Sequence, residues 1–191
     1  MKKSMPWIRC AGFLVGLAVI LGICDFCFAP SGYVRFILHE VNRKDTQYDT
    51  IILGASHARS AINPEYLDEE LGTNTLNLAI PGETVKDAYY LLKDACESND
   101  VKTVIMDVDY QYWMDEQPQG YFTEPFICQN ITNLKVKTEY LLDNWDTIDL
   151  RNVLVRRLSW DCTWSSVKQN VSTKMTEAYR EYSIEAAGVD G

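Results

Sequence analysis

The chain has 191 residues, of which 47% are hydrophobic and 12% aromatic, a composition that is typical of a folded globular protein and excludes an intrinsically disordered one. Its net charge is −9 at pH 7, and because residues 1–29 carry +2 (three basic residues against Asp25), residues 30–191 carry −11. A domain this acidic repels the phosphate backbone of nucleic acids, so we expect no nucleic-acid partner.

The N-terminal segment has the composition of a membrane anchor. Residues 10–29 are apolar except for Asp25, and a helix of twenty residues spans about 30 Å, one hydrocarbon core. Lys2, Lys3 and Arg9 precede this segment, which predicts a cytoplasmic N-terminus and a remainder on the extracytoplasmic side of a cell membrane.

A cleaved signal peptide is the alternative for the same segment. Residues 11–23 fit the apolar part of a signal sequence, and Cys27-Phe28-Ala29 resembles a cleavage site, although Pro30 directly after it is unfavourable. Residues 31–43 follow with the pattern of a short amphipathic helix lying just outside the bilayer, in which His39 has a surface or packing role.

A short apolar strand is predicted at residues 51–53, ended by Gly54-Ala55 and followed by Ser56. The two small residues allow a sharp turn, which would place Ser56 at the carboxyl end of the strand, the edge at which open α/β sheets bind ligands. Strand, tight turn, serine and helix are the arrangement of a nucleophile elbow. An ordinary serine between a strand and a loop is the alternative.

The next elements alternate between helix and strand. Asn63 and Pro64 begin a helix that Gly72 ends, and a strand at residues 74–80 follows and ends at Pro81-Gly82. Thr84 caps a second helix at residues 85–97, and a third strand spans residues 101–108. This order predicts an α/β fold with a doubly wound parallel sheet of about three strands, preceded by one transmembrane helix. Neither G-x-G-x-x-G nor G-x-x-x-x-G-K occurs, which disfavours nucleotide binding.

The C-terminal half has weaker signals. Residues 110–129 are predicted to be a loop, and residues 134–145, 148–160 and 172–187 to be helices, with no fourth strand. Outside the anchor, Cys96, Cys128 and Cys162 are too far apart in the sequence for a metal site, and the chain has two histidines. We therefore expect neither a metal ion nor a cofactor.

Three stretches, in this order, resemble the first half of the SGNH (GDSL-like) hydrolases: Ile52-Leu53-Gly54-Ala55-Ser56-His57, Leu76-Asn77-Leu78-Ala79-Ile80-Pro81-Gly82 and Val104-Ile105-Met106-Asp107-Val108-Asp109-Tyr110. The similarity covers residues 48–113 and is closest to membrane-anchored bacterial members, such as the D-alanyl-lipoteichoic acid transfer and alginate acetylation proteins. It implies a flavodoxin-like three-layer fold. It also implies ester hydrolysis or acyl transfer on an acylated glycan or cell-envelope polymer, with a membrane acyltransferase as a further partner.

The resemblance assigns a role to individual residues. Ser56 matches the family's nucleophile, and Gly82 matches the glycine whose N–H stabilises the oxyanion. The family's third oxyanion donor is an asparagine after the third strand, for which this chain offers the amide of Gln111. His57 and Asp109 would line the pocket, and a carboxylate at Asp109 would repel an oxyanion.

The general base of the family has no counterpart in the sequence. The family supplies it from an Asp-x-x-His near the C-terminus, whereas this chain has only His39 and His57, neither in such a motif. The resemblance therefore describes three parts: residues 1–29 as leader and anchor, 30–47 as a juxtamembrane helix, and 48–191 as a hydrolase-like domain truncated at its C-terminus.

Two other interpretations remain open from the sequence. In the first, the domain has the hydrolase fold but lacks the catalytic triad, and it is a catalytically inactive glycan-binding or scaffold protein of the cell envelope. Alternatively, Asp107 and Asp109 after the third strand match the D-x-D of haloacid-dehalogenase-type phosphatases, in which the first aspartate is the nucleophile and both hold magnesium. Against this, Gln111 stands where those enzymes have Thr or Val.

Overall fold

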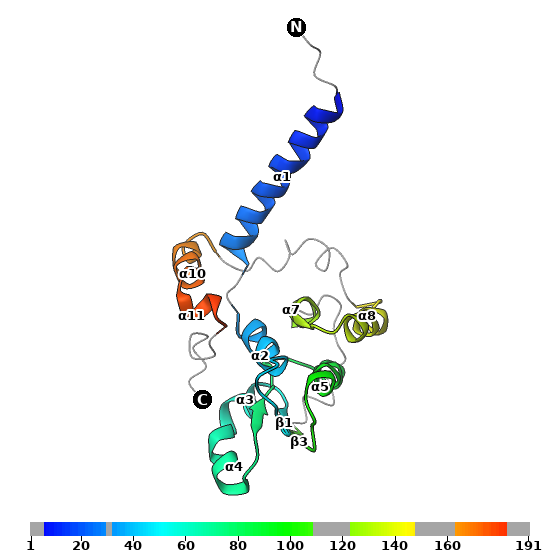
Figure 1. Ribbon diagram of the computed structural model, residues 1–191, viewed down its shortest axis with the longest axis vertical. Coiled ribbons are helices and arrows are strands. Elements are labelled where there is room, and N and C mark those ends of the chain that lie inside the picture. Colours follow the sequence, from blue (N-terminus) through cyan, green and yellow to red (C-terminus); the bar gives the residue numbers. More distant parts are fainter. Residues whose placement is uncertain (1–5, 30–31, 109–122, 148–162, 183–191) are drawn as a thin grey trace.

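The structure is a computed structural model that describes residues 6–29, 32–108, 123–147 and 163–182. One long helix, α1 (Pro6–Phe28), projects away from a domain that contains the remaining described elements (Figure 1). The first of these is α2 (Tyr33–Val41), and the sheet lies on the far side of α2 from α1.

The sheet has three parallel strands, β1 (Thr50–Leu53), β2 (Thr75–Asn77) and β3 (Thr103–Met106), in the order β2-β1-β3. Ile51 of β1 is paired with Leu76 on one side and with Val104 on the other. The prediction of three adjacent parallel strands is therefore confirmed, with β2 and β3 shorter than predicted.

Helices pack on both faces of this sheet. Ile52 of β1 packs with Ala58 of α3 (Ser56–Ala61) and with Leu67 of α4 (Pro64–Leu71). Side chains of a strand alternate between the two faces, so the neighbouring residues of β1, Ile51 and Leu53, lie in the larger core on the other side. That core is built with α2, α5 (Val85–Ser98), α7 (Thr123–Asn130) and α8 (Leu134–Asp143).

Local capping signals explain why the predicted helices near the sheet are correct. The side chain of Asn63 accepts a hydrogen bond from the N–H of Glu65, and Gly72 ends α4 in the left-handed conformation at φ +68°. Thr84 and Asp87 form a reciprocal capping box at the start of α5. Both helices thus begin and end where their own residues satisfy the terminal backbone groups.

The amphipathic helix predicted at residues 31–43 forms as α2, but it does not lie on a bilayer with its apolar face. Phe36, Ile37, Leu38 and Val41 are at most 3% exposed. Ile37, Leu38 and Val41 pack into the larger core, and Phe36 packs against Tyr179. The apolar stripe that suggested lipid contact is instead the face that α2 buries against the domain. His39 is on the opposite, exposed side and stacks on Tyr182 at 3.8 Å between ring centroids.

The C-terminal half departs further from the predictions. Residues 110–122 of the predicted loop 110–129 and the whole predicted helix 148–160 lie outside the described residues. The rest of the predicted loop is wrong, because it belongs to the helix α7. Residues 183–187 of the predicted helix 172–187 lie outside the described residues, and over residues 172–182 the prediction of one helix is wrong, because the chain forms α10 (Val167–Lys174) and α11 (Glu177–Arg180). Thr176 separates the two by accepting a hydrogen bond from the N–H of Tyr179, which starts a new helix.

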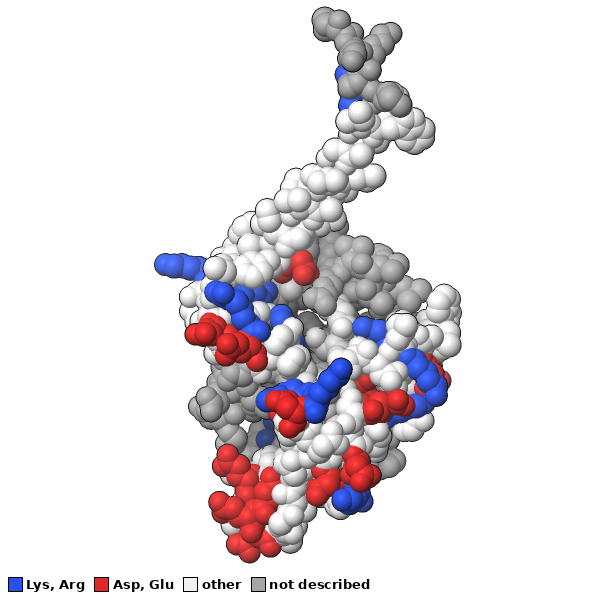
Figure 2. All heavy atoms as spheres, viewed as in Figure 1, with Lys and Arg blue, Asp and Glu red and all other residues white. Residues whose placement is uncertain are grey.

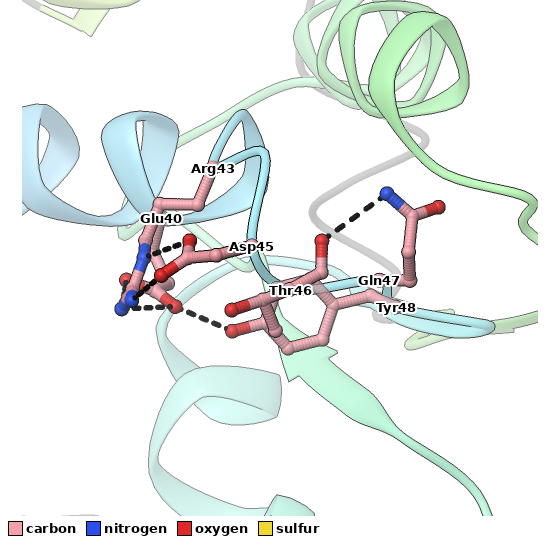
Figure 3. Close-up of polar contacts among 6 residues, drawn as sticks. All are labelled: Glu40, Arg43, Asp45, Thr46, Gln47 and Tyr48. Carbon is pink, nitrogen blue, oxygen red and sulfur yellow. Dashed lines mark hydrogen bonds and ion pairs between the residues drawn. The ribbon is translucent and has the colours of Figure 1, made fainter.

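Polar contacts fix the connection from α2 to β1 (Figure 3). The hydroxyl of Tyr48 donates to the Glu40 carboxylate at 2.6 Å, and Arg43 bonds both Glu40 and Asp45. Glu40 is 6% exposed and Tyr48 is 8% exposed, so this hydrogen bond is buried. Burial and the neighbouring Glu40 carboxylate together raise the pKa of Tyr48, which therefore stays protonated and keeps donating.

Replacing Tyr48→Phe tests this connection. The change removes the hydroxyl and leaves a buried carboxylate with one donor fewer, so we expect the free energy of unfolding to fall by about 1.5–3 kcal/mol. Urea unfolding of the chain in detergent measures the loss. The control is Asp45→Asn, whose exposed side chain contributes little, and an equal loss in both variants would contradict the importance of the buried bond.

Candidate site at the carboxyl edge of the sheet

Ser56 is the first residue of α3 and follows β1 after two residues. Ala55 is extended (φ −85°, ψ −151°) and serves as the N-cap, so the chain turns from strand to helix between Leu53 and Ser56. The side chain of Ser56 is exposed. The strand, the tight turn and the exposed serine that the sequence predicted are thus present at the carboxyl end of the central strand, but a short helix, α3, begins at Ser56 itself, before the helix that was predicted from Pro64.

Gly54 makes this turn sterically possible. It has φ +147°, and a Cβ placed on it would lie 2.7 Å from the Cβ of Ala58 and 2.7 Å from the Cβ of Asp107. Non-bonded carbon atoms need about 3.5 Å or more, so α3 and the end of β3 approach Gly54 more closely than any side chain would allow. The glycine is therefore required both by conformation and by space.

A buried carboxylate connects the ends of two strands at this turn. Glu83, 4% exposed, accepts the N–H of Gly54 with Oε1 at 3.1 Å and the N–H of Ile80 with Oε2 at 3.1 Å. Gly82, at φ +79°, directly precedes Glu83, and Ser56 lies two residues after Gly54. The link thus places the backbone around Ser56 and around Gly82 at the same edge of the sheet.

Asn77 at the end of β2 fixes the other end of α3. Its Nδ2 donates to the carbonyls of Ala58 at 3.0 Å and Ile62 at 3.1 Å, and its Oδ1 accepts the N–H of Ala79 at 3.2 Å. The Ala58 carbonyl, which also accepts the N–H of Ile62, lies in the last turn of α3, and Ile62 is the residue that follows this helix. The helix that carries Ser56 is thus tied to the strand that leads to Gly82.

Sequence reasoning missed the roles of Glu83 and Asn77. Glu83 stands between a strand-ending Pro-Gly and a helix cap, where an acidic residue is equally typical of an exposed first turn. Asn77 is polar within an apolar run, and that interruption was the only signal of a buried side chain with its own partners.

His57 is the second residue of α3 and its side chain is exposed. Consecutive residues of a helix are separated by about 100° around its axis, so His57 and Ser56 leave the helix in different directions. These different directions disfavour His57 as the base that takes the proton of Ser56. The role of His57 in lining the pocket stays a prediction.

The remaining predicted site residues are not placed. Asp109 and Gln111 lie outside the described residues, so the third oxyanion donor stays a prediction. The described part of β3 leads to Asp107, whose N–H donates to the carbonyl of Leu53 at 3.0 Å and so extends the pairing of β3 with β1 up to the turn. Within the described ranges, no group of three or more His, Cys, Asp or Glu side chains could hold a metal ion.

Comparison with known proteins adds no relative. No family model, no curated protein and no solved structure matches the chain.

Proposed function

We propose that the chain is a cell-surface serine esterase or O-acyltransferase of the SGNH type that acts on an acylated glycan or cell-envelope polymer. The observation that carries the proposal is the placement of Ser56 at the first residue of α3, next to the Glu83 link that brings Gly82 to the same sheet edge. The sequence resemblance assigns these two residues the nucleophile and an oxyanion donor, so both signals concern one site.

The topology of the sheet also supports the proposal. The order β2-β1-β3 is that of the first three strands of flavodoxin-like sheets, in which ligands bind at the carboxyl ends near the switch between the first and third strands. Gly54 is in this position, since α3 and the end of β3 both approach it. A substrate bound there would lie next to Ser56.

The proposed chemistry is acyl transfer through Ser56. Its Oγ attacks the carbonyl carbon of the ester, the ester C–O bond breaks, and the alcohol leaves with the proton that the base took from Ser56; water or an acceptor hydroxyl then takes the acyl group from Ser56. The N–H groups of Ser56 and Gly82 stabilise the oxyanion, typically by about 3 kcal/mol for each donor. The serine proton needs a base within hydrogen-bond reach. In the proposed mechanism that base is the histidine of an Asp-x-x-His, which the 191 residues do not contain.

The location follows from the N-terminal helix. Helix α1 is long and apolar enough to cross a membrane, and none of its most apolar stretch is buried in the domain. With Lys2, Lys3 and Arg9 before the span, the proposed topology is a single-pass anchor with the domain on the extracytoplasmic side. The polymer substrate and a membrane acyltransferase partner would both be accessible there.

A hydrolysis assay tests the proposal. We expect negligible turnover of p-nitrophenyl acetate by the 191 residues alone, because they supply no Asp-x-x-His, and a gain of several powers of ten in a longer chain that supplies one. Dependence of that gain on Ser56 supports the enzyme. A longer chain that binds the polymer but stays inactive would instead favour the second candidate, an inactive glycan-binding or scaffold protein.

A further inference from the structure

Side chains of α10 cap the C-terminal end of α1, although the two helices are separated by more than a hundred residues in the sequence. The Nζ of Lys174 donates to the carbonyl of Phe26 at 2.7 Å and also to that of Ala29. The Nδ2 of Asn170 donates to the carbonyls of Cys27 at 2.8 Å and Ala29 at 2.9 Å. Three carbonyls at and just after the end of the apolar helix, those of Phe26, Cys27 and Ala29, are thus bound by two side chains of one domain helix.

Both side chains are buried in this contact. Lys174 is 5% exposed and Asn170 is 6% exposed. A lysine ammonium is almost never buried without acceptors, because it loses its hydration, and the carbonyl end of a helix offers both acceptors and a partial negative charge. Removing α1 would therefore leave Lys174 without these carbonyls, so the burial of Lys174 depends on the end of the helix that a signal peptidase would remove.

The contact is connected to the core of the domain through α11. Arg35 of α2 donates to the hydroxyl of Tyr179 at 2.5 Å, and its guanidinium lies 4.6 Å from the ring centroid of Tyr179 and 4.5 Å from that of Tyr182. Tyr179 is buried and also packs edge-on against Phe36 at 5.4 Å. Helices α10 and α11 therefore join α1 to α2, whose apolar face lies in the core.

The outer side of this region carries residues typical of a membrane surface. Trp164 is 84% exposed, and its ring lies edge-on to Phe28 at 4.9 Å. The 23 residues of α1 span about 35 Å at 1.5 Å per residue, slightly more than a hydrocarbon core of about 30 Å. In a membrane-spanning α1, the last turn would therefore reach headgroup depth. Trp is enriched at that depth, and exposed Lys168 and Met175 lie in the same segment.

We propose that residues 163–175 form a membrane-surface collar. In this collar, Asn170 and Lys174 donate hydrogen bonds to the carbonyls at the C-terminal end of an α1 that is not cleaved off. Trp164 lies in the headgroup layer of a phospholipid bilayer, on the side of the membrane where the domain lies. The collar holds the domain at a fixed place on the membrane, whatever reaction the site at the sheet edge performs. It also makes α1 part of the folded protein, in contrast to a signal peptide that is cleaved after Ala29.

Hydrogen exchange of the full chain in vesicles of phosphatidylethanolamine and phosphatidylglycerol tests the hydrogen bonds from Lys174 to the end of α1. Lys174→Met keeps the length of the side chain but removes the donor, and we expect it to raise exchange at the amides of residues 26–29 by about tenfold or more. The control is Lys168→Met, which changes an exposed lysine of the same helix. A Lys174→Met variant with unchanged exchange at residues 26–29 overturns the collar, even where α10 itself exchanges faster.

Fluorescence quenching tests the lipid contact. The signal of Trp164 is the difference in emission between the chain and Trp164→Phe, which keeps an aromatic ring against Phe28. We expect vesicles that contain lipid brominated near the headgroup to quench this difference strongly, and lipid brominated near the chain ends to quench it less. A difference signal that neither lipid quenches overturns the proposal.

Discussion

Replacing Gly54→Ala is expected to destabilise the domain by about 2–6 kcal/mol, a large part of the typical stability of about 5–15 kcal/mol. The added methyl group would lie 2.7 Å from carbon atoms of Ala58 and Asp107, and φ +147° is a conformation that alanine rarely adopts. Neither neighbour is the end of a flexible side chain, so α3 or the end of β3 must shift. Urea unfolding in detergent measures the loss.

Gly72→Ala is the matched control for this prediction. Gly72 also has a positive φ, +68°, but a Cβ there meets nothing within 4 Å. The substitution therefore introduces only the left-handed backbone strain, about 1–2 kcal/mol. If the two alanine variants were equally stable, the close approach of α3 and β3 at Gly54 would not exist in the folded protein.

Replacing Ser56→Ala is expected to abolish the esterase activity of a longer chain that supplies Asp-x-x-His. Loss of the nucleophile from a serine hydrolase reduces the rate by several powers of ten, and the residual rate comes from binding and the oxyanion donors. The control is Ser60→Ala, since Ser60 is an exposed serine one turn further along α3. Turnover of p-nitrophenyl acetate, with folding checked by circular dichroism, measures both variants.

His57→Ala distinguishes the assignment of the base. We expect a much smaller effect than for Ser56→Ala, because His57 leaves α3 in a different direction from Ser56 and is predicted to line the pocket rather than to take the proton. If the 191 residues were fully active on their own and His57→Ala removed that activity, His57 would be the base, and the assignment of roles would be wrong.

The sheet and the helices α4 and α5 were predictable because their signals are local, whereas the short helix α3 that carries Ser56 was not predicted. The β-branched run at β1, the Asn63 and Thr84 caps and the terminating Gly72 each act within a few residues, and the helices and strands follow them. The turn before Ser56 was predictable for the same reason, since two small residues follow a buried strand.

The features that escaped prediction depend on partners far away in the sequence. The structural role of Glu83 depends on its hydrogen bond to the N–H of Gly54, and that of Lys174 depends on its hydrogen bond to the carbonyl of Phe26. The apolar stripe of α2 would serve a bilayer or a core equally well, and only packing against the domain decides between them. Periodicity and capping motifs carry no information about such contacts.

The most direct test of the proposed nucleophile is covalent labelling with a fluorophosphonate, followed by peptide mapping by mass spectrometry. A longer chain that supplies Asp-x-x-His is used, because an activated serine needs its base. The account predicts one adduct, on Ser56, that Ser56→Ala removes and Ser60→Ala leaves in place. An active esterase whose adduct maps to another residue would contradict the assignment of Ser56 and with it the proposed site at the sheet edge.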